Sequence, residues 1–184
     1  VSFDSNSLVV NNEKIPVLNF SQNKNIPWGD FSVDLVIDST GKYLTRKLAL
    51  NHIKSGAKKV IITAPPKEKS IKTIVLGVNN NIIKKTDSII SNASCTTNCA
   101  APMIKTLNDY FEIEKAYVTT IHSYTTDQNL HDADHHDLRR ARSAPNSIIP
   151  TTTGAAKALT NIFPKISIGG CGIRVPVSNG SLTD

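Results

Sequence analysis

Cys95 is the side chain of this sequence that is best suited to nucleophilic chemistry. It follows the apolar run 88–91 and Ser94, and it opens the stretch CTTNC at 95–99, which reads as the start of a helix. Unpaired backbone N–H groups and the positive end of the helix dipole favour thiolate over thiol at such a position. The same N–H groups can stabilise the oxyanion that forms when a thiolate attacks a carbonyl group. We therefore predict that Cys95 is a nucleophile, whereas Cys99, one turn deeper, is interpreted as a small buried hydrophobe.

A cysteine nucleophile needs a base, and His122 is the candidate. It ends the apolar stretch 116–122, which follows the helix expected over 96–111, so its side chain can return to the sheet edge where Cys95 lies. A single histidine is more often structural than catalytic. The assignment of His122 as the base therefore depends on Cys95.

The residues before Cys95 have the pattern of a parallel α/β sheet. Apolar strands are predicted at 33–38, 59–63, 74–78 and 88–91, with a helix over 45–55 that Gly56 ends. A strand, a helix and a strand at this spacing indicate a right-handed parallel crossover. Before them, β-like runs at 7–10 and 14–20 flank Asn11 and Asn12, a pair suited to a hairpin turn. The predicted fold class is α/β, with residues 1–94 forming the latter part of a doubly wound sheet.

The pattern changes after Cys95. A long helix over 96–111 is predicted despite Pro102, which removes one backbone hydrogen bond there. A strand at 116–122, a polar loop through Arg142, a short helix after Thr153 and a strand at 169–177 follow. Residues 95–184 are therefore expected to form the N-terminal part of an α+β domain, and both domains are expected to be incomplete.

Composition and charge limit the classes of function. The net charge of +6 and pI near 9.3 suit an anionic partner, either nucleic acid or a phosphorylated small molecule. No apolar run approaches the roughly 18 residues that span a bilayer, and no signal peptide is recognisable. Three cysteines leave one unpaired in any disulfide scheme, which favours a reduced compartment. The expected location is the cytoplasm.

Several motifs along the chain resemble those of the glyceraldehyde-3-phosphate dehydrogenase family. The stretch SNASCTTNC at 91–99 is similar to the active-site signature of that family. Further matches occur in order at NIPWG (25–29), STG (39–41), GVN (77–79), TIHSYT (120–125), DLRRAR (137–142), IIPTTTGAAK (148–157) and RVP (174–176). The resemblance covers nearly the whole chain, and the loop 127–142 is similar to the bacterial form.

The resemblance implies a phosphorylating oxidoreductase of glycolysis with a Rossmann NAD-binding domain and a catalytic domain. It would convert glyceraldehyde 3-phosphate to 1,3-bisphosphoglycerate with NAD and inorganic phosphate, through a thioester on Cys95, with His122 taking the proton. It assigns Thr125, Asp127 and Arg174 to the substrate phosphate, and Ser94, Thr96, Arg140, Thr153 and Gly154 to inorganic phosphate. It assigns Ser39, Thr40, Gly41 and Thr63 to the cofactor, and it implies a homotetramer for the full-length protein.

Some of these residues also have simpler interpretations, and some family features are missing. Thr153 could serve only as a helix N-cap, and Arg139, Arg140 and Arg142 could be a solvated basic face. No Gly-x-Gly-x-x-Gly motif and no acidic residue for the adenosine ribose is present, so NADP is not separated from NAD. We therefore expect a central fragment, which alone would be inactive.

Three alternatives remain open from the sequence. Erythrose-4-phosphate dehydrogenase shares the cysteine and histidine motifs, although Tyr124-Thr125 and the stretch TTTGAAK at 151–157 are more similar to the glyceraldehyde enzyme. A basic nucleic-acid-binding module would fit the charge, but few aromatic residues are available to stack on bases. The His and Asp residues of 131–137 suggest a metal site, but they fall in one polar loop, and no metal is predicted.

Overall fold

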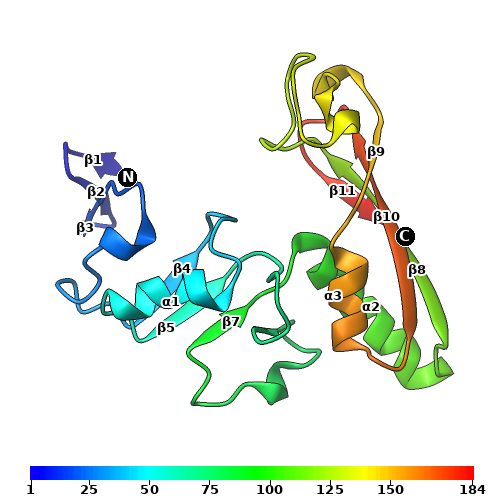
Figure 1. The fold of residues 1–184 in the computed structure, drawn as a ribbon, viewed down its shortest axis with the longest axis horizontal. Helices are drawn as coiled ribbons and strands as arrows, with labels where there is room; N and C mark the ends of the chain where they lie inside the picture. The colour runs from blue at the N-terminus through cyan, green and yellow to red at the C-terminus, as the bar shows by residue number, and fades with distance from the viewer.

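The computed structural model describes all residues 1–184 and arranges them in two lobes, shown in Figure 1. The first lobe holds a small antiparallel sheet and a parallel sheet. The second lobe begins with the long helix α2 (Cys95–Phe111), which directly follows the parallel sheet. Cys95 therefore lies where the chain passes from one lobe to the other.

The parallel sheet of the first lobe confirms the predicted crossover. Its strands are β4 (Leu35–Asp38), β5 (Lys59–Ile62), β7 (Ile89–Ser91) and β6 (Lys72–Thr73), in this spatial order. Helix α1 (Arg46–Lys54) connects β4 to β5. Its apolar side packs on the sheet in a cluster of seven buried residues that includes Ala49, Val60 and Ile62. The carboxyl ends of β4, β5 and β7 thus meet at one edge.

Local signals account for both ends of α1. The Thr45 hydroxyl accepts a hydrogen bond from Leu48 N–H at 3.4 Å, as an N-cap does. At the other end, Gly56 has a φ of +108°, its N–H donates to Ile53 O, and Ala57 N–H donates to His52 O. These two bonds form a Schellman motif, which requires a left-handed residue at the position of Gly56.

The prediction of a strand at 74–78 was wrong. Residues 75–79 form a turn in which Gly77 has a φ of +80° and Val78 N–H donates to Val75 O. The Asn79 side chain closes this turn, because its Oδ1 accepts from Val75 N–H at 2.8 Å and its Nδ2 donates to Thr73 O at 2.9 Å. Local side-chain bonding of asparagine overrides the apolar pattern here, and the sheet is completed by the short strand β6.

The first residues form a three-stranded antiparallel sheet of β1 (Ser2–Phe3), β2 (Ser7–Val10) and β3 (Glu13–Pro16). Asn11 and Asn12 have φ values of 51° and 67°, which confirms the predicted hairpin turn. Strand β3 ends at Pro16, whereas the run predicted at 14–20 extends to residue 20, so the predicted strand was too long. The 3-10 helix η1 (Asn23–Asn25) follows.

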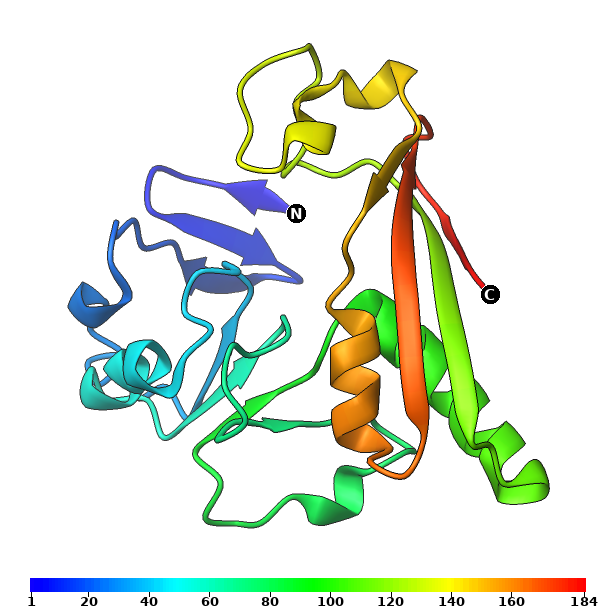
Figure 2. The same cartoon turned by 45° about the vertical axis from the view of Figure 1, so that its right-hand side comes forward.

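The second lobe is built on a mixed sheet, whose long strands run roughly vertically in Figure 2. Its spatial order is β11 (Ser181–Thr183), β8 (Lys115–Ser123), β10 (Ser167–Val175) and β9 (Ile149–Thr151). Strands β8 and β10 run parallel over their whole length, whereas β9 and β11 are antiparallel to their neighbours. Helices α2 and α3 (Ala155–Ile162) pack on this sheet through a buried cluster that includes Ala101, Val118 and Leu159.

The connections between these elements contain three more short helices. They are η2 (Asn80–Ile82), η3 (Leu138–Ala141) and η4 (Ala144–Asn146). The α/β fold class is as predicted, with a parallel sheet followed by an α+β lobe. None of the helices combines the length and the apolar character that crossing a membrane requires.

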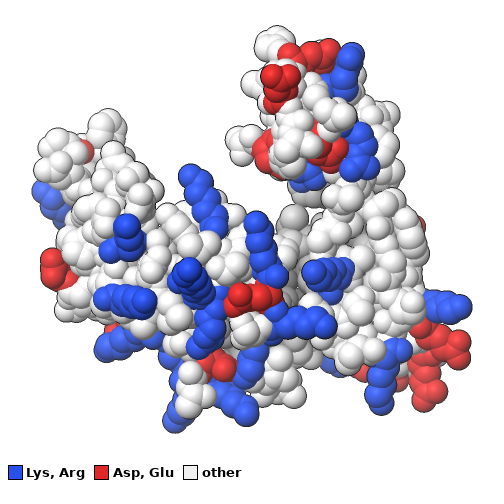
Figure 3. Space-filling model, in the orientation of Figure 1, with Lys and Arg blue, Asp and Glu red and all other residues white.

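Positive charge is unevenly distributed between the lobes. Residues 95–184 contain as many acidic as basic side chains, so the whole surplus belongs to residues 1–94. In Figure 3 lysine and arginine side chains spread over the first lobe, whereas acidic and basic side chains mix in the loop above the second lobe. Any attraction of anions by net charge therefore comes from the first lobe.

Candidate active site

Cys95 lies at a sharp corner between β7 and α2. Ala93 is fully buried and has a φ of +60°, which turns the chain abruptly from strand to helix. Ser94 is the N-cap of α2, and its Oγ accepts from Thr97 N–H at 3.2 Å. The Asn98 side chain closes the corner by donating to Asn92 O and Ser94 O at 2.8 and 2.9 Å. The first helical residue, Cys95, is left exposed at the N-terminus of a 17-residue helix.

His122 lies beside Cys95. The His122 Nε2 atom is 3.5 Å from Cys95 Sγ, although the two residues come from different elements, β8 and the start of α2. This is within hydrogen-bonding distance for sulfur, and it is the separation expected of a nucleophile and its base in a protein without substrate. The structure therefore brings together the two residues that the sequence predicts as catalytic.

Arg174 contacts the other nitrogen of His122. Strands β8 and β10 pair so that Arg174 is directly opposite His122, and Arg174 Nη1 lies 2.8 Å from His122 Nδ1. The same Nη1 donates to Ser123 O at 2.8 Å, and His122 Nδ1 is also 2.8 Å from this carbonyl. Because arginine only donates and a carbonyl oxygen only accepts, Nδ1 can form one of these two bonds at a time. It accepts from Arg174 when the hydrogen is on Nε2, facing Cys95, and it donates to Ser123 O when the hydrogen is on Nδ1.

The charges around Arg174 come from residues of the predicted phosphate sites. Burial lowers the pKa of the Arg174 guanidinium, and the nearby positive charge of Arg140 acts in the same direction. The negative charges of Asp127 and Cys95 oppose this shift. Arg174 is therefore a partly buried cation with no carboxylate in direct contact among its hydrogen bonds, which leaves its charge available to an anion.

A second cluster surrounds Asp127. The Thr125 hydroxyl donates to Asp127 Oδ1 at 2.6 Å, and Arg140 forms an ion pair with Asp127 Oδ2. Arg140 also donates through Nε and Nη2 to Thr151 Oγ1, at 3.0 and 2.8 Å. Burial opposes ionisation of Asp127, but the hydrogen bond from Thr125 and the charges of Arg140 and Arg174 outweigh it, so the pKa of Asp127 lies below its usual value.

The remaining predicted phosphate residues are less close together. Ser94 flanks Cys95, but its hydroxyl is used in the N-cap. Thr96 is buried and its hydroxyl lies 3.5 Å from that of Thr120, so it faces the sheet. Thr153 and Gly154 are at the start of α3, where the Thr153 hydroxyl accepts from Ala155 N–H at 3.2 Å. This bond matches the capping interpretation of Thr153, and the phosphate role of these four residues stays a prediction.

The predicted cofactor residues lie at the carboxyl edge of the parallel sheet. Ser39, Thr40 and Gly41 follow β4, Thr63 follows β5, and all four are exposed. Gly41 has a φ of +67° with open space around the position of a Cβ atom. Asn92 N–H donates to Ile62 O at 2.9 Å, so the Cys95 corner leaves the same edge. Ligands of open parallel sheets bind at this edge, so these residues fit one part of a dinucleotide.

Several residues of the site were not singled out from the sequence. The Ser123 carbonyl contacts His122 Nδ1, and the Thr151 hydroxyl accepts from Arg140. The Asn98 side chain closes the cysteine corner. Asp38 holds the turn of Thr40, since its Oδ1 accepts from Thr40 N–H and Oγ1 at 3.0 and 2.7 Å. Asp38 could have been recognised from the sequence, because an aspartate two residues before a threonine at a strand end is typical of an Asx turn.

The loop 131–137 makes internal contacts. His135 Nδ1 accepts from Asp137 N–H at 2.9 Å, and its Nε2 lies 2.9 Å from Asp127 O. The pKa of Asp137 is lowered to about 2, chiefly by its hydrogen bond with Arg139. Both nitrogens of His135 therefore serve to connect this loop to the Asp127 cluster.

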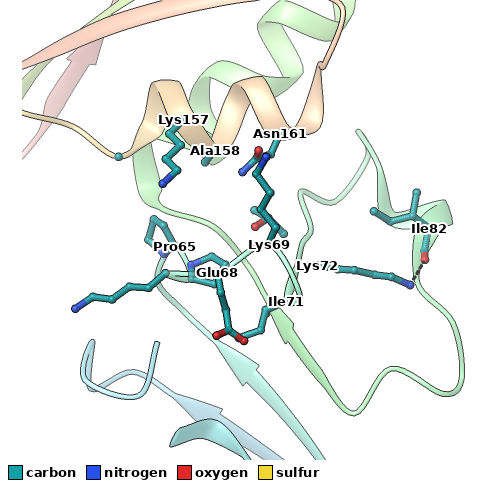
Figure 4. A pocket seen from close by; sticks show the side chains of 13 residues that line it. Pro65, Glu68, Lys69, Ile71, Lys72, Ile82, Lys157, Ala158 and Asn161 are labelled. Carbon is teal, nitrogen blue, oxygen red and sulfur yellow. Dashed lines mark hydrogen bonds between the residues drawn. The ribbon is translucent and has the colours of Figure 1, made fainter. Parts of the chain in front are cut away.

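A cleft of about 690 Å³ lies between the loop 65–73 and α3, as Figure 4 shows. Lys69 and Lys157 extend into it from opposite sides, and Gly154 is part of its lining. Neither Cys95 nor His122 lines this cleft. The predicted catalytic residues therefore lie outside this cleft.

Comparison with known proteins gives a consistent result along the chain. Residues 1–46 match the family model of the glyceraldehyde 3-phosphate dehydrogenase NAD binding domain, and residues 94–184 match that of the C-terminal domain. A glyceraldehyde-3-phosphate dehydrogenase of Geobacillus stearothermophilus is 49% identical over 187 aligned residues, covering 100% of this chain and 56% of that protein.

Two further relatives show the same extent. Glyceraldehyde-3-phosphate dehydrogenase 2 of Bacillus subtilis is 50% identical over 181 residues, covering 97% of this chain and 53% of that protein. The chloroplastic glyceraldehyde-3-phosphate dehydrogenase A of Scenedesmus vacuolatus is 49% identical over 183 residues, covering 98% of this chain and 58% of that protein. This chain thus spans about half the length of these relatives, and it belongs to the glyceraldehyde-3-phosphate dehydrogenase family.

Proposed function

We propose that the full-length protein oxidises glyceraldehyde 3-phosphate to 1,3-bisphosphoglycerate with NAD and inorganic phosphate, as a step of glycolysis. The observation that carries this proposal is the 3.5 Å contact between Cys95 Sγ and His122 Nε2 at a helix N-terminus, with Arg174 beside it. Membership of the family supports the substrate and the cofactor.

The proposed chemistry starts with attack of the Cys95 thiolate on the aldehyde carbon, which forms a carbon–sulfur bond. The resulting oxyanion lies near the backbone N–H groups at the start of α2, which can donate to it. His122 donates a proton to this oxyanion, which gives the hemithioacetal, and takes the same proton back as the carbonyl re-forms. NAD, held in part by Ser39, Thr40, Gly41 and Thr63, would supply the hydride acceptor, so that the aldehyde carbon would be oxidised to a thioester. Phosphate oxygen then attacks the thioester, and the Cys95 thiolate leaves.

The two hydrogen positions on His122 suit different steps. With the hydrogen on Nε2, His122 can donate to the thiolate or to the new oxyanion, while Nδ1 accepts from Arg174. To act as a base, Nε2 must be free, and the hydrogen then belongs on Nδ1, donating to Ser123 O at 2.8 Å. Arg174 must leave Nδ1 in that state, and an anionic phosphate is a suitable new partner for it.

We also propose the assignment of anion sites and domains that the resemblance implies. Thr125, Asp127 and Arg174 would serve the substrate phosphate, with Asp127 orienting its neighbours because a carboxylate repels phosphate. Ser94, Thr96, Arg140, Thr153 and Gly154 would serve inorganic phosphate. The NAD-binding part would end at residue 94, and the full-length protein would be a cytoplasmic homotetramer.

The test uses the full-length protein with NAD, phosphate and either glyceraldehyde 3-phosphate or erythrose 4-phosphate. We expect preference for the shorter aldehyde. Cys95→Ser should abolish turnover, His122→Asn should lower it by about 10²- to 10⁴-fold, and the matched Cys99→Ser should leave it unchanged. Without phosphate, mass spectrometry should find an acyl group on the Cys95 peptide. Turnover without Cys95, or preference for erythrose 4-phosphate, would contradict the proposal.

A further inference from the structure

A chain of polar contacts runs from Trp28 to the turn after β4. The Trp28 indole N–H donates to His52 Nδ1 at 3.0 Å, and His52 Nε2 lies 3.3 Å from Asp38 Oδ2. The second carboxylate oxygen, Oδ1, accepts both hydrogen bonds from Thr40. The side chains of His52 and Asp38 are only 5% and 1% exposed, so water does not compete for these bonds.

The direction of each hydrogen bond is fixed. An indole N–H only donates, so His52 Nδ1 must accept, and Nε2 then carries the hydrogen that is donated to Asp38. Tyr43 stands edge-on to the His52 ring, with 5.8 Å between ring centroids, and limits its rotation. Burial opposes ionisation of Asp38, but hydrogen bonds from His52 and Thr40 outweigh it and place the pKa of Asp38 below its usual value.

Asp38 also holds the neighbouring strand end. Thr63 N–H donates to Asp38 O at 3.0 Å, and the Thr63 hydroxyl lies 3.3 Å from the same oxygen. Asp38 thus fixes Thr40 through its side chain and Thr63 through its main chain. Both residues are exposed at the sheet edge and are predicted to bind the dinucleotide. Asp38, His52 and Trp28 themselves lie behind this surface.

We propose that Trp28, His52 and Asp38 form a positioning relay that fixes the Thr40 turn and thereby sets the affinity for NAD. The inference rests on the proposed function and adds residues that do not touch the reacting atoms. Without the hydrogen bond from His52, the Asp38 carboxylate could rotate and the Thr40 turn could move. The relay therefore affects dinucleotide binding and not the step at Cys95.

The first test compares His52→Leu with Val60→Ala in the full-length protein. His52→Leu removes both ring nitrogens, whereas Val60→Ala removes buried volume in the same cluster without touching the relay. We expect His52→Leu to raise the Kd for NAD about tenfold, as loss of roughly one hydrogen bond would. At saturating NAD, kcat and the KM for the aldehyde should stay within about twofold. Val60→Ala should lower the melting temperature but leave the Kd for NAD unchanged.

Conservative variants separate positioning from general stability. His52→Gln keeps an amide that can donate to Asp38 and should restore much of the affinity. Trp28→Phe keeps the ring but removes the N–H donor, and it should raise the Kd for NAD severalfold. In a double-mutant cycle, His52→Leu and Thr40→Val should be clearly less than additive, because both act through the same turn.

The relay is overturned if His52→Leu binds NAD like the wild type, or if its effect and that of Thr40→Val simply add. If His52→Leu does not fold, Trp28→Phe decides, and an unchanged Kd for NAD in that variant overturns the relay. Failure of the proposed function looks different, because the wild-type protein would then not bind NAD or not turn over the aldehyde.

Discussion

Arg174 makes the two nitrogens of His122 unequal. It lies 2.8 Å from Nδ1, while Nε2 faces Cys95 at 3.5 Å. While Nδ1 accepts from Arg174, the hydrogen lies on Nε2, between the ring and the sulfur. Arrival of a phosphate that attracts Arg174 would release Nδ1 toward Ser123 O. The acid and base roles of His122 are therefore coupled to anion binding in the proposed mechanism.

The ion pair between Asp127 and Arg140 gives a prediction for stability against pH. The Asp127 side chain is 51% exposed and that of Arg140 is 15% exposed. Because the pKa of Asp127 is lower in the folded protein, its stabilising contribution is complete above the unfolded value of about 3.9 and is lost as pH falls through the folded value. Asp127→Asn should therefore lower the urea midpoint at pH 7, by an amount equivalent to about 1 kcal/mol or less, and should have little effect well below pH 4.

Asp132→Asn is the matched control for this prediction. Asp132 pairs with Arg142 in the same loop, but both side chains are mostly exposed, at 55% and 70%. Exposed pairs contribute little, so this variant should resemble the wild type at every pH. An Asp127→Asn variant whose loss of stability did not depend on pH would show that charge is not the cause.

Residue types and local spacing singled out Cys95 and His122 as candidates, and the structure places them 3.5 Å apart, while their catalytic roles stay predictions. The contacts that complete the site could not be predicted from residue types and spacing. Arg174 reaches His122 because β8 and β10 pair in one particular register, and Thr151 holds Arg140 because β9 lies beside β10. These contacts depend on long-range pairing, which a single sequence does not specify residue by residue.

At the scale of elements, helix α1 follows from local rules. Gly56 ends the helix as predicted, and Thr45, the first residue of the predicted range, is its N-cap. The end at Gly56 also has a long-range role, because a Cβ atom at this position would collide with the backbone of Gly29. Glycine is required there both for its conformation and for its lack of a side chain.

Gly56→Ala should therefore destabilise the full-length protein strongly. The positive φ alone costs about 1 kcal/mol, and the collision with Gly29 should raise the loss above roughly 2 kcal/mol. The control is Gly77→Ala, which has a similar positive φ but open space around the added carbon. Urea unfolding of both variants checks the prediction, and equal losses would show that the contact with Gly29 is not important.

The error at 74–78 shows the limit of apolar patterning. Ile74 and Val75 are buried, as in a strand, but they lead into the turn 75–79, which Asn79 closes. A buried turn and a buried strand have the same composition over four or five residues. The available signal against a strand was the run of asparagines Asn79, Asn80 and Asn81, because asparagine is rare in strands and common in turns.

At the scale of the whole molecule, the site depends on two sheets that meet at one corner. The first sheet brings Thr63 and the Cys95 corner to its carboxyl edge, and the second brings His122 and Arg174 beside each other. Helix α2 connects them, because it begins at Cys95 and packs on the second sheet. The longer strands and helix α2 were predicted from the sequence, whereas the order of strands within each sheet and the meeting of the two sheets at this corner were not.

One face of the parallel sheet in the first lobe is not covered by other elements of this chain. On β4, Leu35 and Ile37 are exposed while Val36 and Asp38 are buried, so one face of the parallel sheet is open. Parallel sheets are normally covered on both faces. This chain spans about half the length of its relatives, and functional tests therefore belong on the full-length protein.

The central claim is that Cys95 is an activated nucleophile because His122 lies beside it. The most direct test is the rate of iodoacetamide labelling at Cys95 and Cys99 in the full-length protein, measured by peptide mass spectrometry. Cys99 lies one turn along the same helix and is exposed, so its interpretation as a buried residue was wrong, and it serves as an internal control. We predict that Cys95 reacts much faster than Cys99, and that His122→Asn slows the labelling of Cys95 alone. Equal rates at the two cysteines, or a Cys95 rate that does not respond to His122→Asn, would contradict this account.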